Sequence, residues 1–352
     1  MRQADLRFLL KALQELLAPK CVEFYSVEGV RLGDKHSLEQ YIHEVTHISH
    51  QALRSNDFKG FTVEERLSWA KGRNTKRVED KAYCLLGIFN VFLVHNYGEG
   101  ANAWKQLEKK IYQDRDKLSE QMRKILSSLP HVSEAAFNSQ LNGSFPICLP
   151  NTRAELLQEL DNWVDGHDEP RLLWLNGIAG TGKSTVARTA SRRWHDRKVL
   201  GASFFFSRGN GEVSSSKKLM TTLAWQLANR IAVAKSVICE AIREQEDIVS
   251  NSLWDQWEHL IMRPLSKIKP QDDPPTLVLV IDALDECDER NNLRGILVSF
   301  AKAKSLRNLR LKVLITSRPE LLIRSGLKRV AEAEHKTIVL HEIPSSFFER
   351  DL

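Results

Sequence analysis

The stretch Gly177-Ile-Ala-Gly-Thr-Gly-Lys-Ser184 fits the pattern G-x-x-x-x-G-K-[ST], which is typical of a loop that wraps around phosphate groups. It follows an apolar run, residues 172–175, that predicts a strand, and it precedes residues 185–194, which predict a helix. Glycine adopts conformations that a Cβ excludes, so backbone N–H groups at the helix start can point inward at phosphate oxygens. The alternative is a Gly-rich turn before an ordinary helix. The motif in this context favours nucleotide binding.

The pattern also predicts a role for each position in the loop. Lys183 would reach the β and γ phosphates, and the hydroxyl of Ser184 would bind Mg²⁺. The loop residues predicted to contact the nucleotide are Gly177, Ile178, Ala179, Gly180, Thr181, Gly182, Lys183, Ser184 and Thr185.

A second apolar run leads into the acidic residues that are predicted to bind the metal. Thr276-Leu-Val-Leu-Val-Ile281 suits a parallel strand covered on both faces, and it leads into Asp282-Ala-Leu-Asp285-Glu286, which resembles a Walker B segment. Because open α/β sheets bind ligands at the carboxyl ends of their strands, Asp282 is predicted to hold Mg²⁺ through its water shell. Glu286, or failing that Asp285, is predicted to polarise the attacking water. The alternative is an acidic, solvated helix start.

A third apolar run, Leu311-Lys-Val-Leu-Ile315, is followed by Thr316-Ser-Arg318-Pro319, and the proline suits the first turn of a helix. A guanidinium at this strand end would stabilise charge on the γ phosphate or sense its presence. Arg318 is therefore the third predicted catalytic group, with an uninvolved surface arginine as the alternative.

The bulk composition is that of a globular protein of about two domains, with 352 residues, 42% hydrophobic and 27% charged. The five cysteines include no C-x-x-C pair, which argues against a disulfide framework and a zinc site and favours a reducing compartment. No run approaches the roughly 18 apolar residues of a membrane span, and charges interrupt residues 1–20. We expect a cytoplasmic protein without a membrane span.

The net charge of +6 and the pI near 9.0 come from basic residues scattered among 45 acidic ones. The densest basic cluster, residues 71–77, lies beside Trp69 without a recognisable nucleic-acid module. A mixed, solvated surface is the favoured interpretation, and we expect no nucleic-acid partner.

Residues 1–125 predict a largely helical region, with helical apolar spacing in 38–53, 63–69 and 81–94. A polar segment, 114–140, also has helical character, and a turn at 141–146 precedes the phosphate-loop half. The sequence therefore predicts a domain boundary near residue 140.

The second half alternates between strands and helices, which predicts a doubly wound parallel sheet of the α/β class. About 100 residues with a further strand separate the phosphate loop from the acidic strand. This suits a P-loop NTPase of the additional-strand type better than a nucleotide kinase. The predicted strands are 171–176, 199–206, 277–281, 311–316 and 337–341, and the predicted helices are 184–195, several within 216–267, 293–304 and 319–326.

Together, the motifs of residues 145–345 resemble the NACHT domains of fungal NOD-like receptors, within the signal-transduction ATPases with numerous domains (STAND). The resemblance rests on Cys148-Leu-Pro-Asn-Thr-Arg153, Trp174-Leu-Asn-Gly-Ile-Ala-Gly-Thr-Gly-Lys-Ser184, Ala202-Ser-Phe-Phe-Phe-Ser-Arg208, Val280-Ile-Asp-Ala-Leu-Asp-Glu-Cys287 and Ile315-Thr-Ser-Arg-Pro319. It implies that residues 148–153 border the base, with Thr152 and Arg153 as contacts. The alternative for these two residues is a helix N-cap and its first-turn neighbour.

The N-terminal half resembles the carboxyl-terminal part of heterokaryon-incompatibility (HET) proteins. The matching blocks are Leu13-Gln-Glu-Leu-Leu-Ala-Pro19, Arg66-Leu-Ser-Trp-Ala70, Arg77-Val-Glu-Asp80, Ala82-Tyr-Cys-Leu-Leu-Gly-Ile-Phe89 and Tyr97-Gly-Glu-Gly100. The blocks that precede these in the family are missing. Within the region, Tyr83, Leu86, Ile88, Phe89 and Trp104 are predicted to be core residues.

These observations predict a HET-like region (1–140), a NACHT domain (141–345) and a truncated tail (346–352) where the family continues with helical and winged-helix segments. The expected activity is slow hydrolysis of ATP or GTP with Mg²⁺ that resets a signalling state. The resemblance implies self-association, other signalling partners, and a role in non-self recognition and programmed cell death. The alternatives are a nucleotide-locked scaffold without meaningful turnover and, less favoured, a phosphotransferase acting on a small molecule.

Overall fold

The structure is a computed structural model that describes residues 13–26, 28–55, 58, 60–71, 75–330 and 334–342. The predicted tail, 346–352, lies outside these residues, as do residues 72–74 of the basic cluster. The chain divides into two compact units, Met1–Glu120 and Gln121–Leu352. This division differs from the predicted boundary near 140, because Leu126, Leu129 and Val132 are buried in the core of the second unit.

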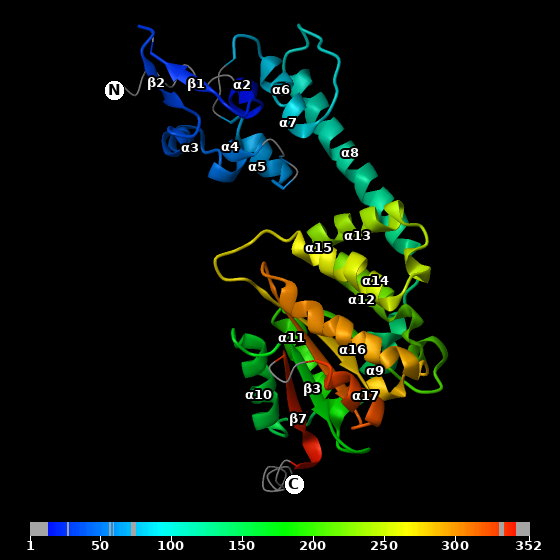
Figure 1. Ribbon diagram of the computed structural model, residues 1–352. Coiled ribbons are helices and arrows are strands. Elements are labelled where there is room, and N and C mark those ends of the chain that lie inside the picture. The colour runs from blue at the N-terminus through cyan, green and yellow to red at the C-terminus, as the bar shows by residue number, and fades with distance from the viewer. Residues whose placement is uncertain are drawn as a thin grey trace. The chain divides into compact units, whose positions relative to one another are not determined.

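The first unit is mainly helical, as the sequence predicts (Figure 1). Its buried core includes Tyr83 and Ile88, and Leu86, Phe89 and Trp104 pack against it half-buried, which confirms all five predicted core positions. A two-stranded antiparallel hairpin of β1 and β2 was not predicted from the sequence. The elements are α2 (Leu13–Leu17), β1 (Glu23–Tyr25), β2 (Arg31–Asp34), α3 (Glu39–Thr46), α4 (His50–Arg54), α5 (Val63–Ser68), α6 (Asp80–Tyr83), α7 (Leu86–Phe89) and α8 (Asn102–Ser127), which continues into the second unit.

The second unit has strands and helices near the predicted positions. Its strands are β3 (Leu172–Asn176), β4 (Leu200–Phe205), β5 (Thr276–Asp282), β6 (Arg310–Ser317) and β7 (His335–Val339). Its α-helices are α9 (Gln140–Gly143), α10 (Ala154–Asp165), α11 (Lys183–Asp196), α12 (Leu219–Arg230), α13 (Ala232–Glu244), α14 (Leu253–Trp257), α15 (Arg263–Ser266), α16 (Leu293–Ala301) and α17 (Leu321–Leu327), with a π-helical turn, η5 (Glu258–Met262), joining α14 to α15. The 3-10 turns are η1 (Ser133–Ala135), η2 (Gly211–Ser214), η3 (Ser216–Lys218), η4 (Ile248–Ser250), η6 (Leu284–Glu286), η7 (Arg290–Asn292), η8 (Lys302–Ser305) and η10 (Leu340–Glu342).

The five strands form one parallel sheet in the order β4-β5-β6-β3-β7. Strand β6 therefore lies between β3, which leads into the phosphate loop, and β5, which ends in the acidic segment. This order confirms the predicted additional-strand topology. It also brings the carboxyl ends of β3, β5 and β6 to one edge of the sheet, where open α/β sheets bind ligands.

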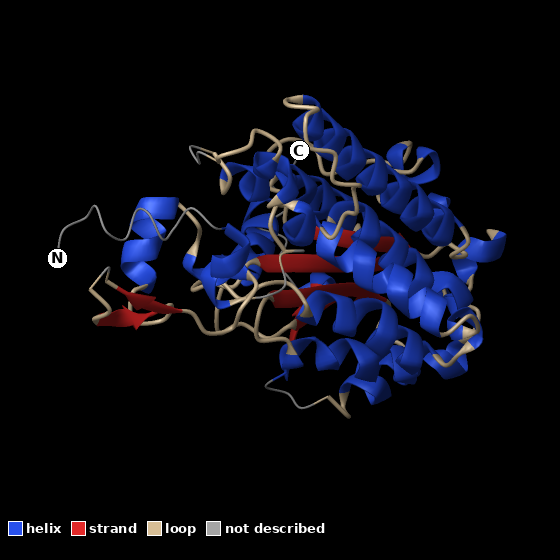
Figure 2. Ribbon diagram, turned by 90° about the horizontal axis from the view of Figure 1, so that it is seen from above, coloured by secondary structure: helices blue, strands red, loops and turns tan. Residues whose placement is uncertain are grey.

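Helices cover both faces of the sheet, and Figure 2 shows the strands between helical layers. On one face, Leu173, Val280 and Leu314 pack with α10 and α11. On the other, Trp174, Leu279 and Ile315 pack with α12 to α17. Because side chains alternate between the faces of a strand, burial on both sides explains why β3, β5 and β6 are almost continuously apolar.

No helix in the described part of the chain combines the length and apolarity needed to cross a membrane. All five cysteines are free thiols.

Candidate nucleotide site

The phosphate loop joins β3 to α11 and relies on glycine where the backbone takes left-handed values. The φ angles of Gly180 and Gly182 are +77° and +82°, and Gly182 is the N-cap residue of α11. Gly177 is required for space, since an added Cβ would lie 2.7 Å from Thr181 Oγ1 and 3.1 Å from the Leu340 Cβ. The loop thus presents backbone N–H groups at the start of a long helix, as an anion site requires.

Lys183, the first residue of α11, folds its side chain back over the loop. Its Nζ donates to the carbonyl oxygens of Gly177 at 2.7 Å and Ile178 at 2.9 Å. Burial lowers the pKa of the ammonium, and the nearby carboxylate of Asp285 opposes this shift most strongly. Lys183 therefore supplies a half-buried cation directly above the loop.

Asp282, the last residue of β5, is buried with only 1% of its surface exposed. Its Oδ1 accepts a hydrogen bond from Thr316 Oγ1 at 2.5 Å, and the Ser184 hydroxyl also bonds to its carboxylate. Burial raises the pKa of Asp282, which these two hydroxyls partly oppose. The structure therefore brings together Ser184 and Asp282, the two predicted metal ligands.

Asp285 and Arg318 lie at the ends of neighbouring strands and bind each other. The Arg318 backbone N–H donates to Asp285 Oδ1 at 3.0 Å, and Arg318 Nε lies 3.4 Å from Asp285 Oδ2. The Asp285 side chain is 3% exposed, whereas that of Arg318 is 47% exposed. The buried carboxylate thus anchors an accessible guanidinium, a geometry that suits Asp285 to positioning rather than to activating water.

Glu286 is held by the segment that follows the neighbouring strand β4. Its Oε2 accepts the backbone N–H of Arg208 at 2.9 Å, while Arg208 Nη2 donates to the Asp285 carbonyl at 3.2 Å. Glu286 is half-buried and close enough for its charge to act on Lys183. The predicted base therefore lies beside the loop, with one oxygen already hydrogen-bonded.

The segment predicted to border the base also contacts the loop. Arg153 Nη2 donates to the Thr181 carbonyl at 3.2 Å, and the Cys148 N–H is fixed by Thr189 Oγ1 of α11 at 2.9 Å. Arg153 is the N-cap residue of α10 in a left-handed conformation, without a capping side-chain bond. The Thr152 hydroxyl donates to the Leu149 carbonyl at 2.8 Å, so Thr152 does not cap the helix.

These residues fit a nucleotide with Mg²⁺ on two observations. Asp282 is a buried carboxylate that forms no ion pair with any described residue, although the charge of Arg188 acts on it. A buried charge of this kind is costly unless a cation accompanies it. Among the described residues, Lys183 hydrogen-bonds only to loop carbonyls, which phosphate oxygens would replace as better acceptors. Ser184 and Asp282 would hold the metal, and the loop with Lys183 would hold the phosphates.

Sequence reasoning gave no role to three residues of this region. Thr316 donates to Asp282 and also accepts the Ala283 N–H at 2.9 Å. Arg208 holds Glu286, and Arg188, one turn after Ser184 on α11, acts electrostatically on Asp282. In the sequence, the only signal for Thr316 and Arg208 was a polar residue at or shortly after the end of an apolar run.

Comparison with known proteins gives two informative similarities. The family model for the N-terminal region of nephrocystin 3 matches residues 151–318. The vegetative incompatibility protein HET-E-1 of Podospora anserina is 34% identical over 280 residues, which is 78% of this chain and 20% of that protein. The chain thus spans about a fifth of the length of that relative. The match to HET-E-1 confirms the predicted resemblance to fungal incompatibility proteins.

Among solved structures, the Aeropyrum pernix ORC1 protein in complex with DNA matches 58% of this chain and 51% of its own, with 19% identity and a TM-score of 0.32. A similarity this low does not establish a shared fold. The fold assignment rests instead on the strand order and on the position of the loop.

Proposed function

We propose that this chain, as a relative of the fungal NACHT-type incompatibility proteins, binds a nucleoside triphosphate with Mg²⁺ and hydrolyses it slowly to reset a signalling state. The supporting observation is the convergence of five groups from three strand ends around Lys183. These are Ser184 after β3, Asp282, Asp285 and Glu286 on and after β5, and Arg318 after β6. A cation at the phosphates, a metal position, a base and a sensor are the parts that phosphoryl transfer to water requires.

Each residue has one role in this proposal. The loop amides and Lys183 bind and orient the phosphates, Arg318 stabilises charge on the γ phosphate, and Glu286 takes a proton from the attacking water. Mg²⁺, when bound, supplies positive charge that neutralises the phosphate oxygens. Asp285 holds Arg318 in place. The proposal includes Thr152 and Arg153 at the base, a NACHT domain over 141–345 and a HET-like region over 1–140.

The proposal also includes a cellular role and partners. The chain would act in the cytoplasm in fungal non-self recognition leading to programmed cell death, with self-association and other signalling proteins as partners. Either ATP or GTP fits this cradle, because the groups named bind phosphate rather than base.

One observation favours the alternative, a nucleotide-locked scaffold without meaningful turnover. The Arg208 N–H occupies Glu286 Oε2 at 2.9 Å, and a carboxylate already bonded in this way is a weaker acceptor for a water proton. Hydrolysis would therefore use the acceptor positions of Glu286 that the Arg208 N–H leaves free.

The test is equilibrium binding of ATP, ADP and GTP with Mg²⁺, with phosphate release followed in the same samples. Lys183→Ala should abolish binding, whereas Lys328→Ala, at an exposed lysine of the same unit, should leave it unchanged. Glu286→Gln should keep binding and lower release about 100-fold or more, the scale of a lost general base. Binding without release in the wild type would establish the scaffold instead, and unchanged binding in Lys183→Ala would refute the site.

A further inference from the structure

A cavity of about 370 Å³ lies within the first unit, far along the chain from the phosphate loop. Its volume falls in the range of about 300–1,000 Å³ that small-molecule sites occupy. Three of its described lining residues carry a fixed positive charge and one carries a negative charge, so the cavity has an excess of positive charge. The described residues that line it are Lys20, Lys35, His36, Glu39, Leu53 and Arg54.

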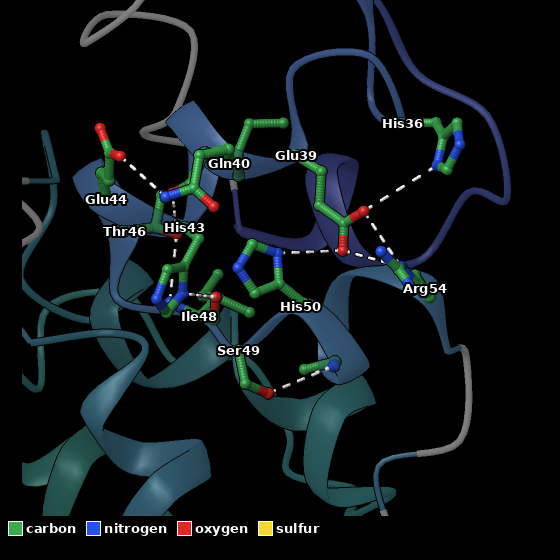
Figure 3. Close-up of polar contacts among 12 residues, drawn as sticks. His36, Glu39, Gln40, His43, Glu44, Thr46, Ile48, Ser49, His50 and Arg54 are labelled. Carbon is green, nitrogen blue, oxygen red and sulfur yellow. Dashed lines mark hydrogen bonds and ion pairs between the residues drawn. The ribbon is translucent and has the colours of Figure 1, made fainter.

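Glu39, the one acidic residue among the described residues that line the cavity, is already paired. Its side chain is 8% exposed, and Figure 3 shows Arg54, His50 and His36 directed at its carboxylate. Arg54 Nε lies 2.9 Å and 3.0 Å from the two oxygens, and His50 Nδ1 lies 3.1 Å from Oε1. The hydrogen bond from Arg54 is the main cause of the lowered pKa of Glu39. This carboxylate is therefore ionised and committed to Arg54 and His50.

The lysines of the cavity have no acidic partner among the described residues. Lys35 is 5% exposed, and the one described acceptor for its Nζ is the Pro19 carbonyl, at 3.2 Å. An ammonium has three donors, so a neutral carbonyl leaves most of its capacity and all of its charge uncompensated. Burial accordingly lowers the pKa of Lys35. Lys20, which is exposed, forms no ion pair with any described residue.

Arg54 also has hydrogen-bond donors that no described residue uses. Only its Nε bonds to Glu39, and its two terminal nitrogens make no hydrogen bond to any described residue. The guanidinium is fixed in direction by Glu39, so it presents these nitrogens without further loss of side-chain freedom. An anion that enters the cavity would meet a preoriented guanidinium and two ammonium groups.

We propose that this cavity binds the phosphate group of a small phosphorylated molecule. Three cations with several unused donors match a group that has two negative charges and three or more acceptor oxygens better than they match a monovalent carboxylate. Leu53 is the one apolar side chain among the described lining residues, so the cavity does not suit the acyl chain of a lipid. Glu39 is a positioning residue, since it acts on the ligand through Arg54.

The test uses the full chain carrying Lys183→Ala, so that phosphate cannot be held by the loop of the second unit. Inorganic phosphate and pyrophosphate are titrated by calorimetry into this protein and into versions that also carry Lys20→Gln or Lys35→Met. Each added substitution should weaken binding about tenfold or more, the scale of one charge-assisted contact. Lys105→Gln, at an exposed lysine of α8 in the same unit, is the matched control and should leave the affinity unchanged.

Three outcomes overturn the proposal. One is the absence of saturable binding up to about 10 mM of either probe, a generous limit for a specific site. Another is binding that neither lysine substitution weakens. The third is binding to vesicles that contain anionic lipid without any binding of free phosphate, which would identify a membrane headgroup surface. Lys20 is exposed, so Lys20→Gln keeps the test valid if Lys35→Met impairs folding. None of these results bears on nucleotide binding by the loop.

Discussion

Lys312→Met tests how the central strand of the sheet accommodates a buried charge. Lys312 lies on β6 with none of its surface exposed. Its ammonium donates to the carbonyls of Trp163 and of Gly166, the latter at 2.7 Å, at the end of α10, and lies 5.3 Å from the centre of the Trp163 ring. Burial lowers the pKa of Lys312 from 10.5 to about 8. The lysine thus links the end of α10 to the sheet through hydrogen bonds, and burying its charge costs free energy.

The sign of the pH effect follows from this lowered pKa. Between pH 8 and 10.5 the unfolded chain holds a proton on Lys312 that the folded chain has released, so the free energy of unfolding rises with pH across this window. Each pKa unit corresponds to about 1.4 kcal/mol, which gives about 2 kcal/mol between roughly pH 7 and pH 9.5. Methionine cannot titrate, so this gain should be absent from the variant. At neutral pH the two proteins should differ less, because losing two hydrogen bonds offsets the relief of a buried charge.

The assay is urea unfolding at several pH values, followed by tryptophan fluorescence. The difference in unfolding free energy between wild type and Lys312→Met should change by about 2 kcal/mol in favour of the wild type from roughly pH 7 to pH 9.5. Taking the difference between the unfolding free energies of the two proteins removes the contributions of the titrating groups that both proteins share. Lys328→Met, at an exposed lysine, should give a profile parallel to the wild type. A parallel profile for Lys312→Met would refute the reasoning.

Three further substitutions probe the site. Thr316→Val removes the hydroxyl that bonds Asp282 and should weaken Mg²⁺ affinity about tenfold, measured by Mg²⁺ titration of nucleotide binding; unchanged affinity would exclude this positioning role. Gly177→Ala places a Cβ 2.7 Å from Thr181 Oγ1 and should weaken nucleotide affinity about tenfold or more, so an equilibrium titration matching the wild type would show that the loop adapts. Arg318→Ala should lower phosphate release about 100-fold or more with little change in nucleotide affinity, and a normal release rate would remove Arg318 from the catalytic groups.

Sequence patterns were sufficient wherever a property depends on neighbouring residues. The glycines and lysine of 177–184 predict the loop because the backbone conformations and helix start they require are local. The apolar runs before Asp282 and Thr316 predict buried parallel strands because such strands are covered on both faces. The sequence also predicted the additional-strand class, but the strand between β3 and β5 in the sheet is β6, which follows both motifs in the sequence.

Two features, one in the first unit and one at the junction of the units, could not be predicted from the sequence. The hairpin of β1 and β2 consists of strands of three and four residues, which are too short for a periodic pattern to predict their pairing. The division between the units falls earlier than the predicted 140, because burial of Leu126 and Leu129 depends on the core they meet rather than on their own spacing.

The sequence by itself determined the phosphate loop, the acidic strand end and the class of sheet. Only the tertiary structure decided which side chains bind each other: Thr316 with Asp282, 34 residues apart, Arg318 with Asp285, 33 residues apart, and Arg208 with Glu286, 78 residues apart. The physical reason is that a motif specifies backbone conformation through adjacent residues, whereas hydrogen bonds and ion pairs depend on distances that exist only after strands distant in sequence lie side by side.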